Sequence, residues 1–107
     1  MIWRVDRRAT FEALRRARRL REGALTVSWV PGDPGEPPRV AFTIGRRVGS
    51  AVVRNRLRRR LRILVREAAP TLPPGAYLVG VGPEVALLRF QELREMIMRA
   101  FAKVGRR

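Results

Sequence analysis

Seven arginines and one asparagine lie within a single short stretch, residues 54–66. The arginines are Arg54, Arg56, Arg58, Arg59, Arg60, Arg62 and Arg66. A guanidinium group is a planar donor that binds phosphate oxygens in pairs and stacks on nucleic-acid bases. The amide of Asn55 both donates and accepts hydrogen bonds, which suits base edges or 2′-hydroxyls, although an asparagine on a helix can also simply face water. The chemistry of this stretch is the binding of a polyanion.

Residue types that catalyse reactions or bind metals are scarce in the chain. It contains no histidine and no cysteine, which removes the usual general base and the soft metal ligands. The nine carboxylates are scattered, and Glu92 and Glu95 are explained by a solvated helix face. Residues 45–49 lack the lysine and the spacing of a phosphate-binding glycine loop. We therefore expect no catalytic residue and no metal ligand in this chain, and any chemistry belongs to a partner.

The arginine-rich stretch has the period of an amphipathic helix. At about 100° per residue, one face is apolar, and it consists of Val53, Leu57, Leu61, Leu64, Val65 and Ala68. The opposite face carries Arg58, Arg62 and Arg66 with Asn55 and Arg59. Ser50 is a suitable N-cap, and we expect the helix to end near Ala69, before Pro70. Such a helix packs one side on a core and presents the other side to an anion.

Composition limits the class of protein. The 107 residues suffice for one compact domain, and 46% hydrophobic residues support a folded chain. The net charge of +15 favours an anionic partner, with nucleic acid first and an acidic membrane surface second. No apolar run approaches the roughly 20 residues of a membrane span, and the first residues lack the apolar region of a signal peptide. We expect a cytoplasmic protein.

The first half of the chain reads as one helix and two strands. Residues 1–8 are expected to form a loose basic lead-in, followed by a helix over 9–21 with Thr10 as N-cap and Gly23 as its end. Residues 24–30 and 39–46 alternate as strands, and the Pro/Gly-rich residues 31–38 form a loop between them. In the second strand Ala41, Thr43 and Gly45 share one face. These small residues leave room for a ligand to approach the sheet, or for a helix to pack there.

The second half completes the order α-β-β-α-β-α. Residues 76–81 are almost continuously apolar, as in a strand covered on both faces. The last helix begins near Glu84 or Phe90 and ends at Val104, leaving residues 105–107 as a loose tail. We expect one domain over residues 1–107, a two-layer α+β sandwich with a small mixed sheet.

Four aromatic residues could stack on unpaired bases: Trp3, Phe11, Trp29 and Phe42. In a domain of this size, aromatic side chains also commonly belong to the core. The sequence leaves both roles open for each of them.

Residues 40–62, VAFTIGRRVGSAVVRNRLRRRLR, resemble the protein subunit of bacterial ribonuclease P. The resemblance rests on a strand ending in paired basic residues, then a glycine and small apolar residues, then the R-N-R motif formed by Arg54, Asn55 and Arg56. The order of elements agrees over almost the whole chain. The resemblance implies an α/β sandwich with a left-handed βαβ crossover, against the general right-handed rule.

The resemblance also implies partners. They are the catalytic RNA of ribonuclease P, which uses Mg²⁺ bound mainly by the RNA, and the single-stranded 5′ leader of precursor tRNA. Neither a membrane nor a small-molecule ligand is expected. The residues implied to meet the catalytic RNA are Arg46, Arg47, Arg54, Asn55, Arg56, Arg58, Arg59 and Arg62. Those implied to bind the leader, in a cleft between the first helix and the sheet, are Phe11, Arg15, Arg18, Trp29, Ala41 and Thr43.

Three positions depart from the pattern of the family. The second aromatic of the first helix is replaced by Arg15, so contact with the leader there is expected to be more electrostatic. The third predicted strand ends without basic residues, and Ile63 replaces an acidic residue after the last motif arginine. The sequence supports an accessory RNA-binding subunit of an endoribonuclease involved in tRNA processing. The alternatives are a ribosome-associated structural protein and a stand-alone protein nuclease.

Overall fold

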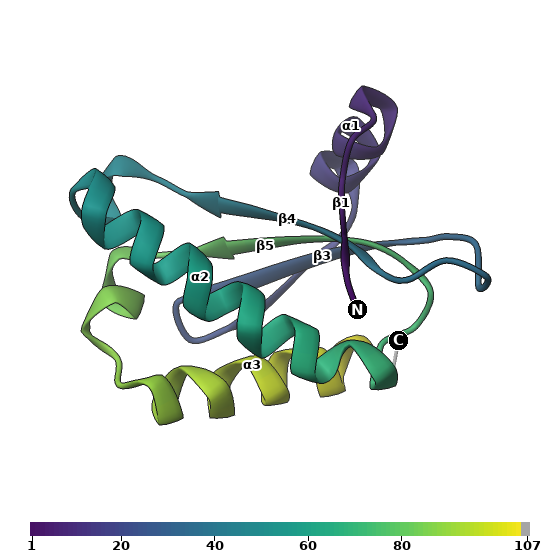
Figure 1. The fold of residues 1–107 in the computed structure, drawn as a ribbon. Helices are drawn as coiled ribbons and strands as arrows, with labels where there is room; N and C mark the ends of the chain where they lie inside the picture. The colour runs from purple at the N-terminus through teal and green to yellow at the C-terminus, as the bar shows by residue number, and fades with distance from the viewer. Residues whose placement is uncertain (106–107) are drawn as a thin grey trace.

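A computed structural model describes residues 1–105 of the chain. A mixed sheet lies between α1 on one side and α2 and α3 on the other (Figure 1). The strands are β1 (Trp3–Arg4), β2 (Arg19–Glu22), β3 (Leu25–Pro31), β4 (Arg39–Ile44) and β5 (Gly75–Val81). The helices are α1 (Arg8–Arg16), α2 (Ala51–Ala68) and α3 (Phe90–Val104), with short 3₁₀ turns η1 (Arg46–Val48), η2 (Ala69–Thr71) and η3 (Pro83–Leu87).

The last strand of the chain occupies the centre of the sheet. The spatial order is β1-β4-β5-β3-β2, with β5 parallel to β4 and antiparallel to β3. β1 runs parallel to β4 at one edge, and β2 runs antiparallel to β3 at the other. The prediction of a small mixed sheet with helices packed on it is confirmed, and α2 is the connection between the adjacent parallel strands β4 and β5.

Apolar side chains cover both faces of β5, so helices pack on both sides of the sheet rather than in one second layer. Tyr77 and Val79 are fully buried on the side of α2 and α3, where the larger core cluster lies. Ala76 and Leu78 point the other way and pack in a smaller cluster with Leu14 of α1. The nearly continuous apolar character of this strand thus has the predicted cause.

The arginine-rich helix forms as its periodicity predicts. The Ser50 hydroxyl accepts a hydrogen bond from the Val53 amide at 3.3 Å and caps α2. The buried residues of α2 are Leu57, Leu61, Leu64, Val65 and Ala68. No helix in the described part of the chain is long and apolar enough to cross a membrane.

Residues 17–22 do not continue the first helix as predicted. α1 ends at Arg16, and residues 19–22 form β2 because their backbone pairs with β3. Glu22 of β2 is held from α3, where the Lys103 ammonium lies 2.7 Å from its carboxylate. That hydrogen bond, followed by the charges of Lys103 and Arg99, holds the pKa of Glu22 below its usual value against the opposing effect of burial. Gly23, with φ +58°, turns the β2–β3 hairpin instead of ending a helix.

The predicted start of the first helix is also corrected. The residue at the N-cap position is Arg7, whose side chain makes no capping hydrogen bond, so Thr10 lies inside α1. The lead-in before it is not loose, because Trp3 and Arg4 pair with β4 and Val5 is only 3% exposed. At the other end, Gly105 follows α3 in a turn, and residues 106–107 of the predicted tail lie outside the described residues.

Arg39 joins the lead-in to the rest of the sheet. Its guanidinium donates to the Arg4 carbonyl at 3.0 Å and lies 4.7 Å from the centre of the Trp3 ring. The same group pairs with Asp6 at 3.6 Å and Glu36 at 3.2 Å. These contacts supply the stability that a two-residue strand lacks on its own.

Tyr77 is the largest fully buried side chain of the core. Its hydroxyl donates to the Pro73 carbonyl, and its ring meets Phe101 of α3 edge-on, with centroids 5.9 Å apart. Burial raises the pKa of this phenol well above its ordinary value near 10.

This raised pKa predicts a loss of stability in alkali. Below about pH 10 both states hold the proton. Above it only the unfolded state releases the proton, so the free energy of unfolding should fall by up to about 1.4 kcal/mol per pH unit until the folded pKa is reached. Tyr77→Phe should be about 1 kcal/mol less stable at neutral pH and should lack this slope. Urea titrations from pH 8 to 11 test this, and since Tyr77 is the sole tyrosine, equal slopes in both proteins would contradict it.

Candidate nucleic-acid interface

The arginine face of α2 flanks a groove at the edge of the sheet. Arg58, Arg62 and Arg66, at successive i, i+4 positions, line it beside β1 and β4. The Arg58 guanidinium donates to the Asn55 side-chain oxygen at 3.2 Å. That contact uses only the oxygen of Asn55, so the amide N–H groups of this exposed residue remain for another acceptor.

The outer arginines of the R-N-R motif differ in environment. Arg56 is exposed, whereas Arg54 is half-buried. Arg59, one turn beyond the motif, is exposed as well. The Nε of Arg54 is buried and has no hydrogen-bond partner within residues 1–105. No hydrogen bond within the described residues therefore holds Arg54 at that atom. A buried N–H without an acceptor is destabilising.

The end of the sheet face next to α1 is open and basic. A hollow of about 910 Å³ lies there, floored by the small residues Thr26, Thr43 and Gly80. Arg46 and Arg47 of η1 and Arg21 of β2 line it, together with one carboxylate, that of Glu84. The paired basic residues after β4 are thereby brought to the same place as the small residues that the sequence predicts to admit a ligand.

α1 covers only part of that face. Phe11 packs half-buried near Ala41 and Leu78, while Arg15 is exposed beside Phe11 on the outer side of the helix. Arg18 follows α1 and is exposed. Four of the predicted leader residues, Phe11, Arg15, Ala41 and Thr43, therefore belong to α1 or to the sheet face that it partly covers.

Trp29 does not join this group. Strand alternation places it with Leu25 and Val27 on the α2 and α3 side, packed against the larger core cluster. Its indole Nε1 donates to the Pro74 carbonyl at 3.2 Å. The grouping of Trp29 with Ala41 and Thr43 is corrected for this reason: the predicted cleft lies on the other face of the sheet.

Arg19 and Arg21, which the sequence analysis placed in the first helix, belong to a strand and lie on the α1 side of the sheet. The β2–β3 register pairs Arg19 with Ser28 and Arg21 with Thr26, which puts both arginines on the same face as those partners. The sequence signal for this strand was the alternation of Arg19, Leu20, Arg21 and Glu22. In the structure Leu20 and Glu22 face α3, and the two arginines face the other way.

Carboxylates neutralise a different part of the molecule. Arg39 pairs with Asp6 and Glu36, Arg94 with Glu67, and both Arg99 and Lys103 with Glu22. Within residues 1–105, no ion pair joins a carboxylate to an arginine of α1, β2, η1 or α2. The positive charge of these four elements is left for an external anion.

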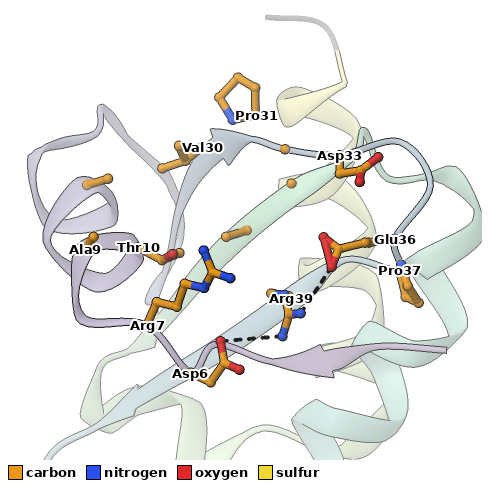
Figure 2. Close-up of a pocket in the computed structure, with 14 residues that line it drawn as sticks. Asp6, Arg7, Ala9, Thr10, Val30, Pro31, Asp33, Glu36, Pro37 and Arg39 are labelled. Atoms are coloured by element: carbon orange, nitrogen blue, oxygen red, sulfur yellow. Dashed lines mark hydrogen bonds and ion pairs between the residues drawn. The ribbon is translucent and has the colours of Figure 1, made fainter.

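A second hollow, of about 350 Å³, lies between the start of α1 and the loop after β3. Figure 2 shows Arg39 between Asp6 and Glu36 at its wall, with Arg7 and Asp33 nearby. Since its charges are of both signs and partly paired, it does not suit a polyanion. No group of three or more acidic, histidine or cysteine residues that could hold a metal occurs in the described part of the chain.

The chain matches the family model described as Ribonuclease P over residues 3–105. The ribonuclease P protein component of Thermobifida fusca is 46% identical over 112 residues, covering 96% of this chain and 76% of that protein. The one from Nocardioides sp. is 43% identical over 101 residues, covering 91% and 86%.

Two solved structures share the fold. The RNase P protein of Staphylococcus aureus is 15% identical with a TM-score of 0.83, over 96% of this chain and 97% of that one. The RNase P protein of Thermotoga maritima is 20% identical with a TM-score of 0.79, over 94% and 96%.

Replacing Arg54 and Arg56 by alanine should weaken polyanion binding without unfolding the protein. Neither side chain has an ion-pair partner in the described structure, so the free energy of unfolding should change by less than about 0.5 kcal/mol. The slope of log affinity against log salt for a single-stranded RNA should become shallower by about 1.4. The pair Arg94→Ala and Arg99→Ala, equal in charge, is the control. Loss of folding in the first variant would instead make these arginines structural.

Proposed function

The chain belongs to the ribonuclease P protein family, and on this basis we propose which RNA binds to which of its surfaces. It is the protein component of ribonuclease P, an RNA-binding subunit of a tRNA-processing holoenzyme. We propose that α2 and η1 bind the catalytic RNA, that the α1 side of the sheet binds the 5′ leader of precursor tRNA, and that the RNA performs the cleavage. The observation that carries this proposal is the unpaired positive charge of α1, β2, η1 and α2.

The proposed surface for the catalytic RNA is the one implied by the R-N-R motif. It consists of Arg46, Arg47, Arg54, Asn55, Arg56, Arg58, Arg59 and Arg62. Six of these eight side chains lie on α2, spread over the sides of the helix that do not face the core, which suits the backbone of a folded RNA. About six phosphate contacts would give a salt slope of roughly −4 to −5.

The proposed leader surface lies across the sheet from α2. It comprises Phe11, Arg15, Arg18, Ala41 and Thr43, to which we add Arg19 and Arg21 and from which we omit Trp29. Its small floor residues let a flexible strand approach the sheet, and its arginines can follow the phosphates of that strand. Phe11 offers a ring for stacking, and Arg15 contributes charge where a second aromatic is absent.

We propose that Mg²⁺ is held mainly by the RNA. The described residues offer no cluster of ligands for a metal, so this chain acts by screening phosphates with its arginines. Such screening lowers the concentration of Mg²⁺ that the RNA needs to fold and to bind its substrate.

We also propose that the β4-α2-β5 crossover is left-handed, as the resemblance implies. The connection joins adjacent parallel strands through a single helix, the arrangement to which the right-handed rule ordinarily applies. An experimental electron-density map of the protein tests the handedness directly.

Reconstitution tests the proposed function. Cleavage of precursor tRNA by the catalytic RNA of the same organism should be stimulated by this protein at low Mg²⁺ concentration, and much less at high Mg²⁺. The measurement is the initial rate with and without protein, alongside the protein alone. Cleavage by the protein alone would revive the nuclease alternative. Stable binding to the RNA without any stimulation would contradict the proposal.

The leader surface has its own test. Arg19→Ala with Arg21→Ala should reduce the affinity of the holoenzyme for precursor tRNA about tenfold, corresponding to two surface contacts of about 0.7 kcal/mol each. The loss should disappear with a substrate whose leader is a single nucleotide. Arg94→Ala with Arg99→Ala serves as the matched control. An equal loss for both substrates would show that these two arginines act elsewhere.

A further inference from the structure

A groove of about 460 Å³ runs around the edge of the sheet where β1 ends. β1 pairs only with Arg39 and Val40, whereas β4 continues to Ile44. Within the described residues, no strand covers β4 on this side beyond Val40. Because α1 and α2 stand on opposite sides of the sheet (Figure 1), this open edge connects the surface of one helix with that of the other.

Three aromatic side chains line this groove: Trp3, Phe11 and Phe42. Trp3 remains 39% exposed although Arg39 lies against its ring. Phe42 is half-buried with its inner side on the larger core cluster, and Phe11 is half-buried on the smaller one. The rings are thus held by the fold and still accessible, so stacking on them would cost little ordering entropy.

The groove also carries three cations, Arg58, Arg62 and Arg66 of α2. Successive members of this row are about 6 Å apart along the helix axis, a spacing suited to consecutive phosphates of one strand. Neither Arg62 nor Arg66 has an ion-pair or hydrogen-bond partner within residues 1–105, and Arg58 contacts Asn55. Rings beside a row of guanidinium groups that have no carboxylate partner are the features that bind single-stranded nucleic acid.

We infer that this edge groove binds an unpaired nucleotide of the catalytic RNA, with its base against Trp3 and Phe42 and its backbone along Arg58, Arg62 and Arg66. The inference rests on the proposed function, because the three arginines belong to the helix proposed to meet the catalytic RNA. A base-paired helix does not fit, since its bases are already stacked and unavailable to the rings. The groove shares Phe11 and Ala41 with the proposed leader surface. The 5′ leader is still the less suitable occupant, because the three arginines of the groove belong to α2, on the opposite side of the sheet from α1 (Figure 1).

The ring test uses Trp3→Leu together with Phe42→Leu, which keeps both side chains apolar and removes the stacking surfaces. Affinity for the catalytic RNA of the same organism, measured without precursor tRNA, should fall at least about tenfold. Base-specific chemical probing should show one or more unpaired nucleotides of that RNA protected by the wild-type protein and not by the variant. Phe90→Leu is the control, since Phe90 is 38% exposed at the start of α3, away from the groove.

The charge test remains informative if the ring variant fails to fold. Arg62→Gln with Arg66→Gln changes only exposed side chains, and should make the salt slope for the catalytic RNA shallower by about 1.4 to 1.8. It should also expose the nucleotides that the wild-type protein protects. Arg94→Gln with Arg99→Gln, equal in charge and on α3, should leave the protection unchanged.

The outcomes separate this inference from the proposed function. If wild-type protein stimulates cleavage at low Mg²⁺ while the folded groove variants bind the catalytic RNA as wild type does, the groove inference is overturned and the function stands. If those variants lose only leader-dependent affinity for precursor tRNA, the groove holds the leader and the assignment to the catalytic RNA is wrong. If wild-type protein neither binds nor stimulates the RNA, the proposed function itself fails.

Discussion

Burial of the aliphatic side of α2 against the sheet is the interaction on which the rest of the structure depends. Leu57, Leu61 and Leu64 are at most 5% exposed, and burying each contributes about 1.5–3 kcal/mol. This contact fixes the rotation of the helix about its axis, and therefore the direction in which each of its arginines points. It also opposes the repulsion among like charges in a chain of net charge +15.

The few carboxylates determine where that charge remains uncompensated. Glu22 and Glu67 neutralise cations of α3, and Asp6 and Glu36 neutralise Arg39. Within residues 1–105, the arginines of α1, β2, η1 and α2 have no carboxylate partner, and their mutual repulsion has a cost in stability. An RNA that binds only the folded state offsets this cost, so assembly with RNA also stabilises the fold.

Features set by local pattern could be predicted from the sequence, and features set by pairing could not. Ser50 marks the start of α2 because a cap and a helical period are local signals. The alternation of residues 19–22 is a weak strand signal because it covers only four residues, and the pairing with β3 is what makes them a strand. β1 likewise depends on its pairing with β4. Strand alternation determines which residues of β3 share a face with Trp29, but whether that face forms the cleft depends on where α1 packs. For this reason the sequence identified the arginine helix and missed Arg19 and Arg21.

The central position of β5 has a consequence for how the chain folds. β3 and β4 do not pair with each other, because β5 lies between them in the sheet. β5 begins only at Gly75, late in the chain. During synthesis the first two-thirds of the chain therefore leaves the ribosome without a strand on which its sheet can close. Contacts between segments so distant in sequence make folding slow and concerted. For this period an arginine-rich segment with exposed apolar strands is vulnerable to aggregation, and early association with an RNA would shield its charge.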